Sequence, residues 1–243
     1  MRVLYVLPGV LSQTELGIKE LDRRLGILRK YAPSDMEVDI RECPGGPTSI
    51  ESTYDEYIAI PPMLKVIKEA EGQGYDAVII GCYGDPGLDA ARELVDIPVV
   101  APGEVSVHIA SMLGHSFSIA AIGDGINYTY IKQVKDYCLS EKLASIRNTG
   151  MSVLEINTNR EAAKKKIIDA CKKAIDEDGA DVILLGCMSM AFMDVSFELS
   201  EALGIPVVNP LIVSLSIAAA LVHSRLSHSA KAYSALKGFP RKH

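Results

Sequence analysis

Short apolar runs alternate with longer stretches of amphipathic helical pattern along the whole chain. The runs do not alternate with polar residues, and Gly or Pro bounds them, which is typical of strands buried on both faces of a parallel sheet. They cover Val3–Leu7, Ala77–Ile80, Pro98–Val100, Phe117–Ile122, Val182–Leu185 and Pro206–Val208. Strands and helices that alternate in this way predict an α/β fold.

Two of the intervening helices carry clear end signals. The Thr158-x-x-Glu161 spacing is that of a capping box, which would open a helix over Arg160–Glu177, and Gly179 would end it. Asn209-Pro210 provides an N-cap followed by proline at the first helical position, and it predicts a helix over Leu211–Arg225.

The chain also contains an internal repeat. Gly74–Cys82 matches Gly179–Cys187, and Ile97–Pro102 matches Ile205–Pro210 further on. Any two strand–helix units look somewhat alike, but here both copies share Gly-Cys directly after a strand and Ile-Pro-Val-Val-x-Pro before a helix. These features favour a duplication, with a helix over Glu104–Leu113 as the counterpart of the last one.

A duplication of this size predicts two pseudo-symmetric lobes, each a small parallel sheet flanked by helices. We expect them to face each other across a cleft that holds the active site. The helix after each Ile-Pro-Val-Val block is expected to pack on the other half, so the lobes are discontinuous. Residues 1–100 with 209–243 would form the first lobe, and residues 101–208 would form the second.

Composition and charge narrow the class of protein. The 243 residues are 48% hydrophobic and 23% charged, with a net charge of −6, as in an ordinary soluble domain. The chain has no basic stripe or arginine-rich arm, so neither nucleic acid nor a membrane surface is an expected partner. The first apolar run is too short for a signal peptide, and no apolar window reaches the roughly 20 residues of a membrane helix. We therefore predict a cytoplasmic protein.

The cysteine and histidine patterns argue against a disulfide framework and against a metal site. The five cysteines, Cys43, Cys82, Cys138, Cys171 and Cys187, form an odd set without a CxxC pair, which predicts reduced thiols. The five histidines never fall in an HExxH or HxH arrangement. We expect no metal site and no organic cofactor.

Cys82 and Cys187 are the candidates for catalysis. Each follows a buried strand and a glycine, at the edge where open α/β sheets bind their ligands. Glycine lets the backbone turn there, and nearby amide N–H groups stabilise a thiolate. By contrast, Cys138 and Cys171 each lie on the apolar stripe of a predicted helix and are expected to be buried. The role of Cys43, which lies in a Pro-Gly turn, stays ambiguous.

Pseudo-twofold symmetry would place the two thiols on opposite sides of one cleft. Racemisation removes a proton from one face of a carbon and returns a proton to the other face. It therefore needs one deprotonated and one protonated group, and a thiol pKa of about 8.5 can be lowered toward neutrality for this purpose. A thiolate/thiol pair at Cys82 and Cys187 meets the requirement.

Five motifs spread over nearly the whole chain carry a family resemblance. They are Gly46–Ser52 with Tyr54–Glu56, Gly81–Leu88, Ile97–Glu104, Leu185–Met190 and Leu226–Ser229. Together they resemble the aspartate/glutamate/hydantoin racemases, most closely the hydantoin and allantoin racemase branch. The resemblance implies a two-lobed fold, a two-base mechanism and a homo-oligomer. Outside these motifs, the turn after the first strand departs from the family. It is Pro8-Gly9 here, where an Asn-Pro-Asn-Thr turn is common.

The residues after each cysteine favour a neutral substrate. Amino-acid racemases of the family continue with Asn-Thr and with Thr-Glu or Thr-His, whereas here Tyr83-Gly84-Asp85 and Met188-Ser189-Met190 follow. Neither run offers a carboxylate clamp, so we favour a 5-substituted hydantoin or allantoin. The candidate substrate-binding residues are Pro8, Ser49, Ile50, Tyr83, Gly84, Asp85, Gly123, Asp124, Met188 and Ser189. Backbone amides of the Gly81–Asp85, Gly186–Met190 and Gly123–Asp124 loops would stabilise the enolate.

Several alternatives stay open. Turn capping explains Asp85 and Asp124 as well as ligand contact does, and packing explains Tyr83 and Met188. The enzyme could instead be an amino-acid racemase, or another isomerase or decarboxylase of the same superfamily. Outside enzymes, two α/β lobes around a cleft also fit a small-molecule binding protein.

Overall fold

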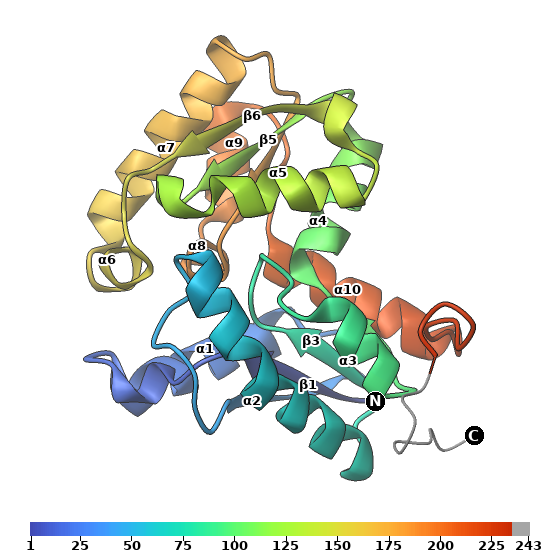
Figure 1. Ribbon diagram of the computed structural model, residues 1–243. Helices are drawn as coiled ribbons and strands as arrows, with labels where there is room; N and C mark the ends of the chain where they lie inside the picture. The colour runs from blue at the N-terminus through green and yellow to red at the C-terminus, as the bar shows by residue number, and fades with distance from the viewer. Residues whose placement is uncertain (235–243) are drawn as a thin grey trace. The chain divides into compact units, whose positions relative to one another are not determined.

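The computed structural model describes residues 1–234, and the strands in this part form two four-stranded parallel sheets (Figure 1). The first sheet has the order β2-β1-β3-β4, and the second has the order β6-β5-β7-β8. The strands are β1 (Arg2–Leu7), β2 (Glu37–Glu42), β3 (Ala77–Ile80), β4 (Val99–Val100), β5 (Phe117–Ala121), β6 (Leu143–Asn148), β7 (Val182–Leu185) and β8 (Val207–Val208). The predicted α/β class is confirmed.

The chain separates into two compact units, each built around one sheet. Of the described residues, the first unit contains Met1–Ile50, Tyr54–Pro102 and 214–234, and the second contains Glu51–Thr53 and Gly103–Val213. The sheets repeat the same strand order in the same chain sequence, as the internal repeat predicts. In each, the first strand pairs with the third: Tyr5 lies opposite Ile79, and Ile119 lies opposite Leu184.

Helices of the first unit lie beside its sheet. They are η1 (Leu11–Gln13), α1 (Gly17–Tyr31), α2 (Thr53–Gly72) and α3 (Leu88–Leu94). Of these, α2 and α3 pack on the sheet through buried apolar residues, whereas α1 buries Glu20, Arg24 and Leu28. On α2, the residues Met63, Val66, Ile67 and Ala70 are buried against strand residues such as Val78. This spacing of three and four residues places them on one helical face, as expected of a helix that covers a sheet.

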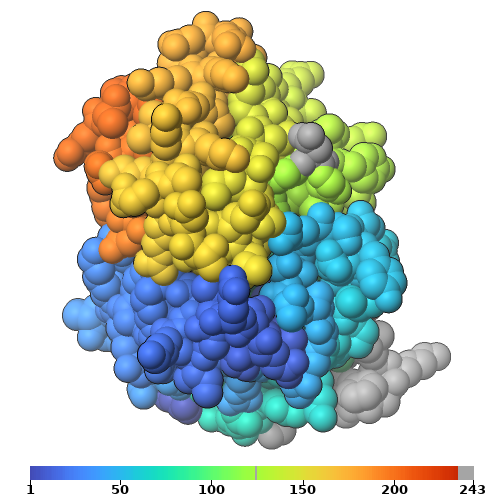
Figure 2. All heavy atoms as spheres, turned by 90° about the vertical axis from the view of Figure 1, so that its left-hand side faces the viewer, coloured from blue at the N-terminus to red at the C-terminus, as the bar shows by residue number. Residues whose placement is uncertain are grey.

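The second unit repeats this scheme with more helices. They are α4 (Pro102–Leu113), η2 (Asp124–Ile126), α5 (Asn127–Asp136), η3 (Ser140–Lys142), α6 (Val153–Thr158), α7 (Arg160–Asp176), α8 (Met188–Ala191) and α9 (Ser196–Leu203), while α10 (Pro210–His223) begins here and continues in the first unit. On α7, Ala163, Ile167 and Cys171 are buried in the core of this unit. The outer face of α7 is polar and forms part of the surface coloured yellow to orange in Figure 2.

The end signals of the helices were predicted with mixed success. The Asn209 side chain accepts a hydrogen bond from Leu211 N–H at 3.0 Å, and α10 begins at Pro210 as predicted. The capping box at Thr158 is wrong, because Thr158 is the last residue of α6 and its hydroxyl donates back to Leu154 O. Asn159 caps α7 instead, through a bond from Ala162 N–H at 3.3 Å.

A capping box that the sequence analysis did not predict occurs one helix earlier, at the start of α6. Ser152 Oγ accepts from Glu155 N–H at 3.2 Å, and the Glu155 carboxylate accepts from Ser152 N–H at 2.7 Å. These two bonds satisfy amide groups that the first turn of α6 leaves without intrahelical partners. None of the helices in residues 1–234 is long and apolar enough to span a membrane.

Candidate active site

Cys82 lies at the end of β3, directly after Gly81. The Gly81 N–H donates to Val6 O on β1 at 2.7 Å. A Cβ at Gly81 would lie 2.6 Å from that oxygen and 2.7 Å from Tyr5 Cε1, which is closer than real Cβ contacts come. Glycine is therefore required here. It lets the backbone pass close to β1 just before the half-buried Cys82.

The turn after Cys82 holds three of the predicted substrate-binding residues. Asp85 N–H donates to Cys82 O at 3.2 Å, and Asp85 itself has a φ of 52°, in the left-handed region. Tyr83 and Asp85 are buried, and Gly84 between them is half-buried. Burial, together with the negative charge of Asp85, raises the pKa of Tyr83, so this phenol stays protonated.

Cys187 stands in the same position on the second sheet. Gly186 N–H donates to Ala120 O on β5 at 2.8 Å. A Cβ at Gly186 would approach Ile119 Cγ2 to 2.6 Å and Ala120 O to 3.0 Å. The glycine before each cysteine is thus required by a close approach to the neighbouring strand.

The short helix α8 begins directly after Cys187. Cys187 has extended backbone, with φ −146° and ψ 136°, and Ala191 N–H donates to Cys187 O at 3.1 Å. The first turn of a helix has amide N–H groups without intrahelical partners, and these favour negative charge at its start. The predicted binding residues Met188 and Ser189 occupy this turn and are buried.

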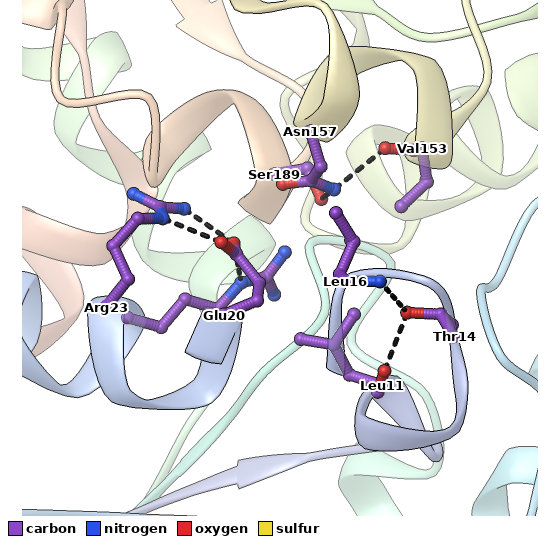
Figure 3. A network of polar contacts seen from close by, with 9 residues as sticks. Leu11, Thr14, Leu16, Glu20, Arg23, Val153, Asn157 and Ser189 are labelled. Atoms are coloured by element: carbon purple, nitrogen blue, oxygen red, sulfur yellow. Dashed lines mark hydrogen bonds and ion pairs between the residues drawn. The ribbon is translucent and has the colours of Figure 1, made fainter. Parts of the chain in front are cut away.

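Asn157, on α6, holds the start of α8 in place, and sequence analysis missed it. Its Nδ2 donates to Val153 O at 2.8 Å and to Ser189 Oγ at 3.0 Å (Figure 3). The Glu51 carboxylate, from the motif around Gly46–Ser52, accepts from Val153 N–H at 3.2 Å. Neither contact has a local sequence signal, because the partners lie 32 and 102 residues apart.

The loop after β1 is a packed turn. Pro8 is buried, and Val10 N–H donates to Pro47 O at 3.1 Å. A Cβ at Gly9 would clash with the same Pro47 oxygen, so the chain can approach this closely only at a glycine. Ser49 and Ile50 are half-buried in the loop that leads to α2.

Thr14 and Glu20, which follow the loop after β1 in the chain, each make hydrogen bonds to neighbouring residues (Figure 3). Thr14 Oγ1 donates to Leu11 O at 2.7 Å and accepts from Leu16 N–H at 3.2 Å, which closes the turn before α1. On α1, the Glu20 carboxylate accepts from Arg23 and from Arg24 Nε. Burial alone would raise the pKa of Glu20, but these two guanidinium groups lower it below its ordinary value.

Topology brings the predicted residues of each unit to one sheet edge. In the first sheet, Val6 of β1 pairs with Ile80 of β3, so the Pro8 loop and Cys82 leave the same edge between adjacent strands. In the second sheet, Ala120 of β5 pairs with Leu185 of β7, so the Gly123 loop and Cys187 do likewise. Each pair marks the point where the strand order reverses, the usual ligand position in open α/β sheets. The side chain of Asp124 lies outside the described part of the structure.

The remaining cysteines differ from this pair. Cys171 is fully buried, which raises the pKa of its thiol to about 12. Cys43 is also buried, and burial with the nearby charge of Glu42 raises its pKa to about 11. The prediction that Cys138 is buried is wrong, because α5 ends at Asp136 and Cys138 follows it as an exposed residue with a φ of 58°. The apolar stripe of that helix stops before it.

Within residues 1–234, all five cysteines are thiols rather than disulfides. The same part of the chain has no group of three or more His, Cys, Asp or Glu side chains placed to hold a metal ion.

Comparison with known proteins gives a consistent set of matches. The family model for Asp/Glu/hydantoin racemases matches residues 23–218. A hydantoin racemase from Pseudomonas sp. (strain NS671) is 40% identical over 195 residues, which cover 80% of this chain and 77% of that protein. The crystal structure of an allantoin racemase from Pseudomonas fluorescens is 29% identical, with a TM-score of 0.89 over 100% of this chain and 99% of that one. An allantoin racemase from Klebsiella pneumoniae is 27% identical, with a TM-score of 0.87 over 100% and 95% of the two chains.

Proposed function

Because the chain belongs to the Asp/Glu/hydantoin racemase family, we propose that it racemises 5-substituted hydantoins with two cysteines and no cofactor. The observation that carries this proposal is the repeated glycine–cysteine turn. Cys82 and Cys187 each leave the carboxyl edge of a sheet at the point where its strand order reverses. Two equivalent thiols are the requirement of a reaction that works on both faces of one carbon.

In the proposed reaction, one thiolate removes the proton from C5 of the ring. The C5–H bond breaks, and its electron pair moves to the adjacent carbonyl oxygen to form an enolate. The thiol of the other cysteine then delivers its proton to the opposite face of C5 and becomes the thiolate. The two cysteines exchange roles with each turnover, so the enzyme accepts both enantiomers.

The surroundings of the two cysteines support a neutral ring as substrate. The residues after them are Tyr83, Gly84 and Asp85 in the first unit and Met188 and Ser189 in the second, without Arg or Lys. In the proposal, backbone amides at the start of α8 and in the turn after Cys82 stabilise the enolate oxygen. Their worth is greatest in a site from which water is excluded.

Allantoin is a second candidate within the same reaction. It is a hydantoin ring with a ureido group at C5, and two allantoin racemase structures superimpose on the whole chain. Polar groups such as Ser49 and Ser189 would then contact the ureido group rather than the ring. A substrate panel separates the two candidates.

The test is a circular-dichroism assay of racemisation with pure enantiomers of 5-alkylhydantoins, allantoin, aspartate and glutamate. We expect the signal of the hydantoins or of allantoin to decay from either enantiomer, while the amino acids stay unchanged. Racemisation of the amino acids alone would reject the substrate class. Ligand binding without any hydrogen exchange at C5 in heavy water would indicate a binding protein instead.

The division of work between the cysteines has its own test. Cys82→Ser and Cys187→Ser should each abolish racemisation, because a serine hydroxyl is far too weak an acid to return the proton. The remaining cysteine should still exchange the C5 hydrogen of one enantiomer with solvent deuterium, and the two variants should prefer opposite enantiomers. Exchange of both enantiomers by a single variant would indicate one base rather than two.

The proposal also includes a cytoplasmic location, and a homo-oligomer as the family resemblance implies. Light scattering coupled to size-exclusion chromatography measures the oligomeric state, and a monomeric mass would reject that part.

A further inference from the structure

The side chain of Tyr130 contacts the backbone just before Cys187. Tyr130 lies on α5 and is 1% exposed. Its hydroxyl donates to Gly186 O at 2.7 Å, across 56 residues of sequence. The packing is close, since a Cβ at Gly186 would lie 3.4 Å from the Tyr130 hydroxyl oxygen.

This hydrogen bond fixes a peptide group that belongs partly to Cys187. The Gly186 carbonyl and the Cys187 N–H share one planar peptide unit, so holding the oxygen also sets the direction of that N–H. Gly186 N–H is itself bonded to Ala120 O, at 2.8 Å. Both peptide units that flank Gly186 are therefore held, one by β5 and one by Tyr130. The orientation of the backbone that leads into Cys187 is thus fixed.

Tyr130 also lies on α5, the helix that follows the Gly123–Asp124 loop of the candidate site. The Gly123–Asp124 segment leaves β5, passes into η2 and continues as α5. Tyr130 thus joins the helix that follows the loop after β5 to Gly186, the residue between β7 and Cys187. In the first unit, the tyrosine ring beside the equivalent Gly81 is that of Tyr5, on β1.

We propose that Tyr130 is a positioning residue for Cys187, whose hydroxyl orients the Gly186–Cys187 peptide so that the Cys187 thiol meets the substrate correctly. The inference rests on the two-cysteine function proposed above and adds an asymmetry to it. Loss of the hydroxyl should impair the half-reaction of Cys187 and leave that of Cys82 intact. Tyr130→Phe is the suitable change, because it keeps the buried ring and removes only the hydroxyl.

The experiment measures deuterium exchange at C5 by proton NMR, with both enantiomers of a 5-alkylhydantoin. Tyr130→Phe is combined with Cys82→Ser, in which Cys187 is the remaining cysteine, and separately with Cys187→Ser. The matched control is Tyr75→Phe in both backgrounds. Tyr75 is a buried tyrosine of the first unit that donates to Asp39 Oδ2 at 2.7 Å, and it precedes β3 whereas Cys82 follows it.

We expect Tyr130→Phe to slow exchange about tenfold in the Cys82→Ser background, in keeping with an unpaired buried carbonyl, and to change the Cys187→Ser background less than about twofold. Tyr75→Phe should affect neither background by more than about twofold. Equal slowing of both half-reactions, or loss of both through misfolding, would mean a structural role and overturn the inference. An unchanged rate in the Cys82→Ser background would overturn it as well.

Failure of the underlying function gives a different result. If Cys82→Ser and Cys187→Ser without further change do not exchange opposite enantiomers, the two-cysteine function itself is rejected, and the role of Tyr130 is rejected with it. If these parents behave as expected but Tyr130→Phe shows no asymmetry, only the positioning role is lost.

Discussion

At the scale of single residues, both candidate cysteines depend on the glycine before them. The backbone at Gly81 and Gly186 runs so close to the neighbouring strand that a methyl group would contact it at 2.6 Å. The strands around these glycines are fully buried and have no room to move apart. The glycine of each Gly-Cys pair is therefore a structural requirement of the turn and not only part of a sequence motif.

The first prediction compares alanine at two glycines. Gly186→Ala should lower the free energy of unfolding by about 1–3 kcal/mol, since the new methyl group overpacks a buried site. Gly26→Ala should raise it by up to about 1 kcal/mol, because Gly26 lies within α1, has nothing within 4 Å of its Cβ position and gains helix propensity. Urea denaturation of both variants measures the two values. Equal changes in the two variants would contradict the close contact at Gly186.

The second prediction concerns thiol reactivity. Iodoacetamide should modify Cys82, Cys187 and the exposed Cys138 at pH 7.5, because only thiolates react and these three are accessible. Cys43 and Cys171 should stay unmodified, since burial raises the pKa of their thiols to about 11 and about 12. Peptide mass spectrometry over time gives each rate.

Substrate provides the control for that experiment. A hydantoin should protect Cys82 and Cys187 but not Cys138, and Cys138→Ser should keep full activity. Inactivation that follows modification of Cys171, with Cys82 and Cys187 still intact, would disprove the assignment of the catalytic pair.

The candidate site was only partly predictable from residues. The Gly-Cys turns carry a local signal because strand, glycine and cysteine are adjacent in sequence. Asn157 and Tyr130 carry none, since each acts through one hydrogen bond to a residue on a distant element, Ser189 and Gly186. An Asn or Tyr on an amphipathic helix looks the same whether its polar atom contacts solvent or a buried loop.

At the scale of elements, the sequence predicted the central strands and the apolar edge strands β4 and β8, and it missed the edge strands β2 and β6. β3 and β7 were predicted to the residue, because both faces are buried and every residue is apolar. β2 and β6 were not predicted, since their sequences, EVDIRE and LASIRN, mix charged and apolar positions and are mostly half-buried. An edge strand has only one pairing partner, so a polar residue there carries less penalty.

The third prediction tests the corrected start of α7. Asn159→Ala should cost about 1 kcal/mol of stability, because the amide side chain caps Ala162 N–H. Thr158→Ala should cost clearly less, since the Thr158 hydroxyl only donates back to Leu154 O at 3.0 Å within α6. Urea midpoints of the two variants, measured side by side, decide between the caps. A larger loss at Thr158 would restore the capping box predicted from sequence.

At the scale of the whole molecule, the internal repeat was the strongest signal in the sequence. It predicted two units of one strand order, and the sheets β2-β1-β3-β4 and β6-β5-β7-β8 confirm it. The motifs gave the family and the racemase class, and both are confirmed by the family match and the 40% identical relative. The substrate was harder to predict, because the residues that would select it come from several loops, each with a second structural explanation.

The last prediction asks whether one chain completes the reaction. Racemisation needs removal and return of a proton on opposite faces of the same bound ring, so both thiols must act before the enolate leaves. A mixture of Cys82→Ser and Cys187→Ser should therefore exchange the C5 hydrogen of both enantiomers and still not racemise either one. Each variant returns the deuteron to the face from which it took the proton. Polarimetry and proton NMR on the same sample separate exchange from inversion, with wild-type enzyme at half concentration as the reference. If the mixture recovers racemisation after subunits are allowed to exchange, the two cysteines of one site come from different chains. If it recovers at once, the enolate escapes between the two steps, and the proton transfers are independent events.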